Sequence, residues 1–187
     1  MLKAQHSATV LLATGLLASA FASAADIERL EATHTDHRYT LSFEVVLAAE
    51  RDKVWQIMTD YENLPRLSKT IGESHILKTE HSPEHRVSIT FHACILIFCK
   101  TMKKVVDIEA RPQDDIVVTG VPALSDFSYS VEHWEVSAEG AKTRLRYSAE
   151  MVPDFFIPPL IGPWLVKSFL QREIRGIAIK VEELAGQ

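Results

Sequence analysis

The chain has 187 residues, of which 47% are hydrophobic and 24% are charged, and its formal net charge is -5. This length and composition suit one globular domain with an apolar core, and they exclude a disordered or low-complexity chain. The mild acidity, without a cluster of Lys and Arg, argues against nucleic acid as a partner. For the same reason, any contact with a membrane surface would be mainly apolar.

Residues 1–24 have the pattern of a secretory signal peptide. Lys3 precedes an apolar run from Ala8 to Phe21, and the small residues Ala22-Ser23-Ala24 follow at once. We expect cleavage after Ala24, export across the inner membrane to the periplasm, and a single mature domain of residues 25–187. An uncleaved membrane span fits less well, because the apolar run is short.

The first part of this domain contains two predicted strands, of which the second is the better supported. Residues Ile27 to His34 alternate weakly, whereas Arg38 to Ala48 alternate regularly between apolar and polar side chains. The apolar members of the second strand share one face and are Tyr39, Leu41, Phe43, Val45 and Leu47. The period then changes: residues 54–58 predict a short helix, 61–64 a second short helical turn, and 71–79 another strand.

The stretch from Arg86 to Ala110 exceeds the ~3 to 10 residues of an ordinary strand, so it should fold back on itself. The natural turn lies at the centre of the sequence CILIFC, between Cys94 and Cys99. In the resulting hairpin, Lys104 falls on the same side as apolar neighbours and is a misfit there. Further strands are predicted at residues 116–119, 127–133 and 143–151.

The last predicted element is a long amphipathic helix from Pro163 to Leu184. Its apolar side chains follow helical spacing and are Val166, Leu170, Ile174, Ile177, Val181 and Leu184. One such helix after a series of antiparallel hairpins predicts an α+β fold, in which a curved antiparallel sheet wraps around the helix. A single helix has to cover a wide concave face, so we expect an internal cavity beneath it.

Several motifs in the chain resemble the START-like, helix-grip superfamily. They are VWQIMTDYENLPRL at Val54 to Leu67, Ser125-Asp126-Phe127, Trp134, Thr143-Arg144-Leu145 and the Pro-rich PDFFIPPLIGPW. The nearest likeness is to the polyketide cyclase/dehydrase and coenzyme Q-binding group, and it covers roughly Arg38 to Leu184. The resemblance implies a helix-grip fold with two short helices after the first core strand. It leaves the function open, since lipid carriers, hormone and quinone binders and aromatase/cyclases share the scaffold.

Cys94 and Cys99 are the most informative pair of side chains. If residues 95–98 form a four-residue turn, the two cysteines become cross-strand neighbours on the polar face of the hairpin, and export would allow a disulfide. Two reduced, half-buried thiols are the alternative. The pair alone is not expected to bind a metal, because no Cys-x-x-Cys companion exists.

A set of residues on the apolar sheet face and the inner side of the last helix is predicted to line the cavity and bind a ligand. These residues are Ile89, Phe91, Met102, Val106, Phe127, Tyr129, Val131, His133, Tyr147, Met151, Leu170 and Ile174. Among them, Tyr129, His133 and Tyr147 could orient a polar headgroup or a quinone-like carbonyl. Ordinary core packing is the alternative for each.

Two apolar loops are expected at one end of the fold, where the resemblance places the cavity mouth. Their predicted membrane-contact residues are Ile95, Leu96, Ile97, Phe98, Phe155, Phe156, Ile157, Leu160, Ile161 and Trp164. The alternatives are that these loops pack on each other and close that end, or that they dock a protein partner of unknown identity.

The leading hypothesis is an exported binding protein that holds a lipid or another hydrophobic small molecule in its cavity and carries it to or from a membrane. The rival is a cyclase/dehydratase-type enzyme acting on a polyketide-like or aromatic substrate through Tyr129, His133 or Tyr147. A polar pair deep in the cavity would favour the enzyme, and an all-apolar cavity would weaken it. No catalytic residue, metal site or cofactor is assigned, because no catalytic triad order, phosphate loop or nucleotide fingerprint stands out.

Overall fold

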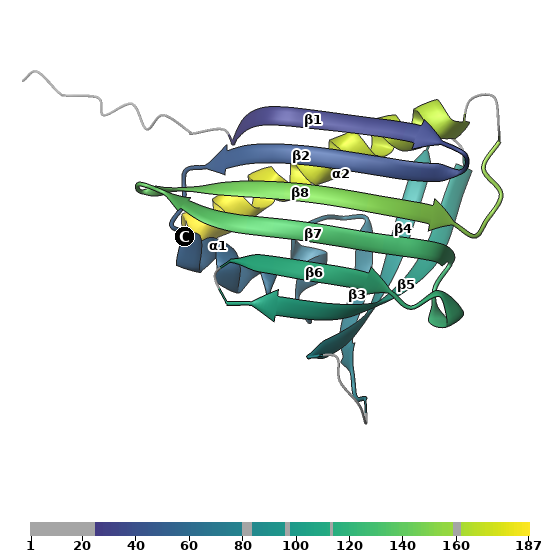
Figure 1. Ribbon diagram of the computed structural model, residues 1–187, viewed down its shortest axis with the longest axis horizontal. Coiled ribbons are helices and arrows are strands. Elements are labelled where there is room, and N and C mark those ends of the chain that lie inside the picture. The colour runs from purple at the N-terminus through teal and green to yellow at the C-terminus, as the bar shows by residue number, and fades with distance from the viewer. Residues whose placement is uncertain (1–24, 80–83, 96–97, 113, 159–161) are drawn as a thin grey trace, which may run out of the picture.

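The computed structural model describes residues 25–79, 84–95, 98–112, 114–158 and 162–187. Eight antiparallel strands form one curved sheet in the order β1-β2-β8-β7-β6-β5-β4-β3, and a long C-terminal helix lies across one of its faces (Figure 1). The predicted α+β helix-grip architecture is therefore confirmed.

The elements follow one another along the chain with short connections. The strands are β1 (Asp26–Thr35), β2 (Arg38–Leu47), β3 (Ile71–Leu77), β4 (His85–Ile95), β5 (Phe98–Arg111), β6 (Asp115–Gly120), β7 (Phe127–Glu139) and β8 (Lys142–Pro153). The helices are α1 (Arg51–Met58) and α2 (Gly162–Ala185), with 3-10 turns η1 (Leu64–Arg66) and η2 (Pro122–Leu124). None of the helices in the described ranges has the length and apolarity needed to cross a bilayer.

The regularly alternating strand β2 lies beside β8, with Leu41 opposite Ala149 and Val45 opposite Leu145. Leu41 and Val45 are almost fully buried and belong to the main apolar cluster. The strand β1 pairs on the other side of β2 and forms one edge of the sheet. The alternating pattern is thus explained by one sheet face that packs on α2 and one that faces outward.

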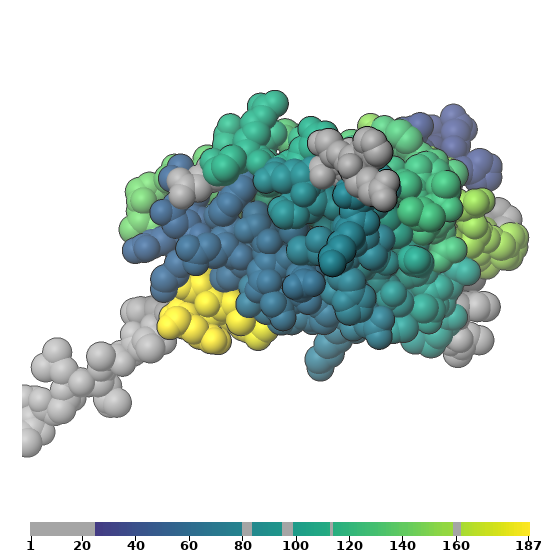
Figure 2. Space-filling model, turned by 90° about the horizontal axis from the view of Figure 1, so that it is seen from below, coloured from purple at the N-terminus to yellow at the C-terminus, as the bar shows by residue number. Residues whose placement is uncertain are grey.

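The inner stripe of α2 packs onto the β2 and β8 half of the sheet. Ile174, Ala178 and Val181 are buried there, in the same cluster as the inward side chains of both strands. The backbone N–H of Ala48 donates to Glu182 Oε2 across 2.6 Å, which fixes the C-terminal part of α2 to the end of β2. This end of α2 packs on α1, as the contact of yellow and blue atoms in Figure 2 shows.

The β4–β5 hairpin differs in one detail from the sequence expectation. The register pairs Cys94 with Cys99 and also Ile95 with Phe98, so the strands are connected through residues 96–97 instead of a four-residue turn. The cysteines nevertheless remain cross-strand neighbours, because extending each strand by one residue leaves their pairing unchanged.

Candidate functional site

A cavity of about 260 Å³ lies between the sheet, the η1 segment and α2. Apolar side chains from β2, β4 to β8 and α2 make up most of its wall, and Ile89, Val106 and Leu170 are examples from three of these elements. Its volume is slightly below the ~300 to 1,000 Å³ that is common for small-molecule pockets. A compact apolar molecule suits this space better than a large one.

Nine of the residues predicted to bind a ligand border this cavity. They are Ile89, Phe91, Met102, Val106, Phe127, Tyr147, Met151, Leu170 and Ile174. The helical spacing of α2 and the strand alternation of β4, β5 and β8 direct them to a common space, although ligand contact itself stays a prediction.

The predicted inward orientation of Tyr129, Val131 and His133 is wrong. A β-bulge inserts an extra residue in β7, between the pairs Phe127–Pro153 and Tyr129–Val152. Because strand side chains alternate with a period of two, this insertion moves the following odd-numbered residues to the outer face. Glu132 and Trp134 face the cavity instead.

On the outer face, Tyr129 and His133 have other surroundings. Tyr129 is 38% exposed, and the Arg38 guanidinium lies 4.6 Å from its ring centre. His133 Nε2 lies 3.2 Å from Asp115 Oδ2. The imidazole therefore takes part in a surface network and is not the cavity group that the sequence pattern indicated.

A buried polar group interrupts the apolar wall of the cavity. Lys104 is 5% exposed and forms an ion pair with Glu132 Oε1, while the Tyr147 hydroxyl donates to Glu132 Oε2 across 3.0 Å. The Tyr147 ring is held against the Trp134 indole, with ring centres 3.9 Å apart. Burial, together with the neighbouring Glu132 carboxylate, raises the pKa of Tyr147 well above its ordinary value, so its hydroxyl remains a donor.

The sequence pattern predicts Tyr147 at this cavity but gives no indication of Glu132, the carboxylate that its hydroxyl contacts. The signal for Lys104 was present, since the hairpin pattern placed this charge among apolar neighbours. The signal for Glu132 was absent, because an uninterrupted strand would have directed it outward. Only the bulge brings Glu132 to the side of the sheet where Lys104 lies.

A second polar cluster borders the cavity where the segment after η1 meets α2. Ser68 Oγ donates to Glu173 Oε2 across 2.6 Å, and Thr70 Oγ1 donates to the same oxygen. All three residues border the cavity. The carboxylate thus connects the helix to the loop and gives one side of the cavity a polar margin.

Tyr61 also borders the cavity and is 6% exposed. Its hydroxyl is buried and has no hydrogen-bond partner among the described residues. Burial, with a smaller contribution from the Glu84 carboxylate, raises the pKa of Tyr61 to about 12.

The predicted membrane-contact residues divide into two groups where the structure describes them. Phe155 packs edge-on against Phe127, with ring centres 6.0 Å apart, and half-buried Ile157 lies close to Gly162. Phe156 and Trp164, by contrast, are 83% and 65% exposed. The positions 96, 97, 160 and 161 lie outside the described residues, as do the side chains of Ile95 and Phe98.

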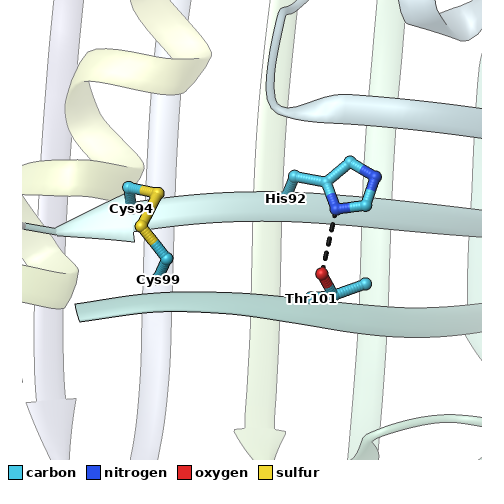
Figure 3. Close-up of a disulfide and its surroundings, with 4 residues drawn as sticks. All are labelled: His92, Cys94, Cys99 and Thr101. Atoms are coloured by element: carbon cyan, nitrogen blue, oxygen red, sulfur yellow. Dashed lines mark hydrogen bonds between the residues drawn. A yellow bond between two sulfur atoms is a disulfide. The ribbon is translucent and has the colours of Figure 1, made fainter.

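Cys94 and Cys99 form the predicted disulfide, with their Cα atoms 4.0 Å apart. Two residues farther from the hairpin turn on each strand, the His92 imidazole and the Thr101 hydroxyl form a hydrogen bond of 3.0 Å (Figure 3). All four residues are exposed, which agrees with the polar face expected for the pair.

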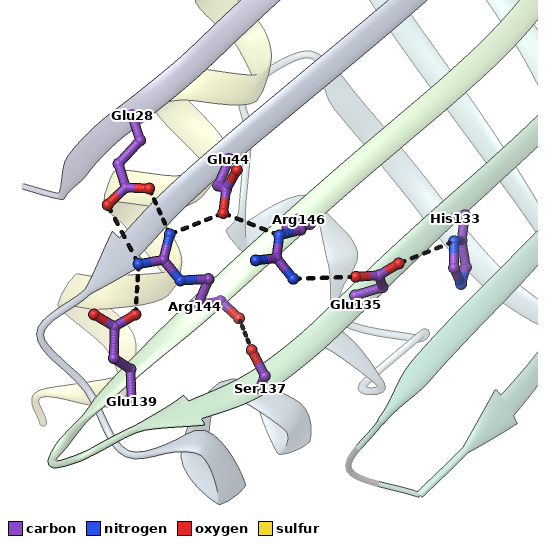
Figure 4. Close-up of polar contacts among 8 residues, drawn as sticks. All are labelled: Glu28, Glu44, His133, Glu135, Ser137, Glu139, Arg144 and Arg146. Atoms are coloured by element: carbon purple, nitrogen blue, oxygen red, sulfur yellow. Dashed lines mark hydrogen bonds and ion pairs between the residues drawn. The ribbon is translucent and has the colours of Figure 1, made fainter.

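The outer sheet face carries a network of charges that joins four strands (Figure 4). Arg144 on β8 forms ion pairs with Glu28 on β1, Glu44 on β2 and Glu139 on β7. Hydrogen bonds to Glu28 and Glu44 raise the pKa of Arg144. The network holds strands together at the surface and lies on the opposite side of the sheet from the cavity.

In the described part of the chain, no group of three or more His, Cys, Asp or Glu residues is arranged to hold a metal.

The sheet, the long helix and the apolar cavity between them define a helix-grip protein. The family described as polyketide cyclase/dehydrase and lipid transport matches residues 38–182. This match spans more than half of the sequence, and the chain belongs to that family. No curated protein matches the chain significantly.

Solved structures show the same fold at low sequence identity. A STAR-related lipid transfer protein from Xanthomonas axonopodis has a TM-score of 0.65 and 15% identity, over 88% of this chain and 100% of that chain. The Zhui aromatase/cyclase from Streptomyces sp. R1128 has a TM-score of 0.63 and 14% identity, over 80% and 94%. A START superfamily protein from Mycobacterium smegmatis has a TM-score of 0.62 and 16% identity, over 78% and 98%.

Proposed function

We propose that the protein binds a lipid or another apolar small molecule beneath α2 and carries it to or from a membrane. The observation that carries this proposal is the cavity of about 260 Å³, whose wall is mostly apolar. Burying apolar ligand surface there would be favourable by ~25 cal/mol per Å². The family description, which includes lipid transport, agrees with this function.

The membrane contact in this proposal rests on Phe156 and Trp164. Large aromatic side chains exposed to this degree are suited to an interface between water and lipid. The export of the protein rests on the signal-like pattern of residues 1–24. A purified protein whose mass begins at Ala25 would support export, and an intact N-terminus after expression in an exporting host would contradict it.

Native mass spectrometry of protein from an export-competent host, followed by solvent extraction, tests the binding function. We expect a defined apolar adduct, and we expect the purified protein to take up the neutral fluorescent probe N-phenyl-1-naphthylamine. The variant Ile89→Trp should lower probe uptake, because it fills part of the cavity. The control Thr119→Trp adds the same indole at an exposed position of β6 and should leave uptake unchanged. A protein with neither adduct nor probe uptake would contradict the proposal.

A second candidate, a cyclase/dehydratase-type enzyme, is favoured by the Lys104–Glu132 pair. The ammonium group could polarise a substrate carbonyl, and the carboxylate could accept a proton. However, both oxygens of Glu132 already accept hydrogen bonds, from Lys104 and Tyr147. We therefore favour ligand binding over catalysis as the function of the cavity. If the protein closes a ring in a poly-β-ketone thioester, and this activity is lost in Glu132→Gln but kept in Glu135→Gln, catalysis would be favoured over binding.

A further inference from the structure

Lys104 has hydrogen-bond donors for which the described residues provide no acceptor. An ammonium group carries three N–H donors. The described residues give Nζ one acceptor, Glu132 Oε1, and one ring, that of Phe127, whose centre lies 5.5 Å away. Lys104, Glu132 and Phe127 all border the cavity. A ligand in the cavity can therefore offer an acceptor oxygen to a donor that is already buried and in place.

The charge of this donor is already balanced. Glu132 supplies one negative charge, and its two oxygens are occupied by Lys104 and the Tyr147 hydroxyl. A carboxylate or phosphate in the cavity would add a second negative charge without a second cation, and burying an uncompensated charge is strongly unfavourable. A neutral carbonyl oxygen could accept a hydrogen bond from Lys104 and leave the net charge of the Lys104–Glu132 pair at zero.

We propose that the cavity selects uncharged ligands that carry a carbonyl-type acceptor oxygen, with Lys104 as the donor and Glu132 as the group that excludes anions. The proposal rests on the proposed binding function and names the ligand class of that same cavity. Tyr147 is a positioning residue, since its hydroxyl fixes one oxygen of Glu132 while its ring rests on Trp134. A pure hydrocarbon would fit the apolar wall but would leave the donors of Lys104 unpaired.

Displacement of N-phenyl-1-naphthylamine by three ligands of equal carbon number tests this selectivity. The ligands are 2-dodecanone, dodecanoate at pH 7.5 and dodecane. We expect 2-dodecanone to bind about tenfold or more tightly than either of the others, as a hydrogen bond to a charged donor permits. Equal or tighter binding of dodecanoate would overturn the proposal, and so would equal binding of dodecane.

Two variants separate the roles of the ion pair. Glu132→Gln keeps an acceptor for Tyr147 but removes the negative charge, so dodecanoate should now bind more tightly than 2-dodecanone. The double variant Lys104→Met with Glu132→Gln removes both charges and should bind 2-dodecanone and dodecane equally. An unchanged preference for 2-dodecanone in either variant would overturn the proposal. Lys103→Met is the matched control, because Lys103 is the exposed neighbour of Lys104 and its loss should change nothing.

The probe distinguishes a failure of the binding function from a failure of the ligand selectivity. If wild-type protein binds N-phenyl-1-naphthylamine but prefers dodecanoate, the binding function stands and the selectivity is overturned. If wild-type protein binds neither the probe nor any of the three ligands, both are overturned. Thermal unfolding of each variant identifies any loss of binding that is due to misfolding, and the double variant, which leaves no unpaired charge, then decides the result.

Discussion

Thr143 on β8 donates its hydroxyl hydrogen to the carbonyl oxygen of Ala49 across 2.7 Å, and its side chain is fully buried. This bond joins the start of β8 to the residues just before α1. Replacing Thr143 by Val keeps the shape but leaves the Ala49 carbonyl without this donor, so we expect the free energy of unfolding to fall by about 1 to 3 kcal/mol. Urea unfolding measures the change. Thr33→Val, at an exposed position of β1, is the control and should shift stability by less than about 0.5 kcal/mol.

Alkaline pH should destabilise the protein through its buried tyrosines. The pKa of Tyr61 is raised from 10.0 to about 12 in the folded protein, mainly by burial. Stability from this shift is fully present below pH 10 and is lost as the pH rises from 10 to 12, because the unfolded chain ionises first. A pKa difference of two units between the folded and unfolded states changes the free energy of unfolding by about 2 to 3 kcal/mol.

The variant Tyr61→Phe checks the contribution of this residue. It removes a hydroxyl that has no partner among the described residues, so we expect no loss of stability at neutral pH. Its stability should also decline less steeply than that of the wild type between pH 10 and 12. Parallel pH profiles of the two proteins in urea unfolding would show that Tyr61 does not carry this dependence.

The buried ion pair should be costly to break from one side. Lys104→Met leaves the Glu132 carboxylate buried without its cation, and such changes typically cost about 3 to 5 kcal/mol of stability. Adding Glu132→Gln removes the remaining charge, so the double variant should be more stable than Lys104→Met alone. A double-mutant cycle by chemical unfolding measures the coupling, and additive effects of the two substitutions would contradict the expected interaction.

Local patterns predicted the parts of the fold that have regular repeats. The alternation in β2 and the helical spacing in α2 identified both elements, because β2 buries one face along its length and α2 buries one face over its second half. The folded-back hairpin at Cys94 and Cys99 followed from strand length alone. These features need only neighbouring residues, and the sequence displays them directly.

The polar part of the candidate site depended on features without a local signal. One extra residue between Phe127 and Tyr129 reverses the orientation of the rest of β7, which moved His133 out and Glu132 in. The bond from Ser68 to Glu173 joins positions that are 105 residues apart. Lys104, as a charge among apolar neighbours, and Tyr147, as a polar residue on the apolar face, have sequence signals. Their shared partner Glu132 could be found only from the three-dimensional register.

The disulfide should make a small contribution to stability. Cys94 and Cys99 are 5 residues apart in sequence. Because the disulfide lowers the conformational entropy of the unfolded chain, closing so short a loop stabilises the folded protein by about 2 kcal/mol. We expect reduction to lower the free energy of unfolding by up to that amount, measured by urea unfolding with and without reductant. The double variant Cys94→Ser with Cys99→Ser should show the lower stability and no response to reductant. A reductant effect that persists in this variant would exclude the disulfide as its cause.

Membrane binding should depend on Phe156 and Trp164 together. Each side chain is mostly exposed, and moving a large apolar side chain from water into an apolar environment contributes about 1.5 to 3 kcal/mol. The double variant Phe156→Ser with Trp164→Ser should therefore bind vesicles of phosphatidylethanolamine and phosphatidylglycerol at least about tenfold more weakly in a flotation assay. Ile179→Ser is the control, because Ile179 is also exposed but lies further along α2. Equal vesicle binding by the wild type and the double variant would remove these aromatic side chains from the proposed contact, whereas a loss on Ile179→Ser would move the contact toward the other end of the helix.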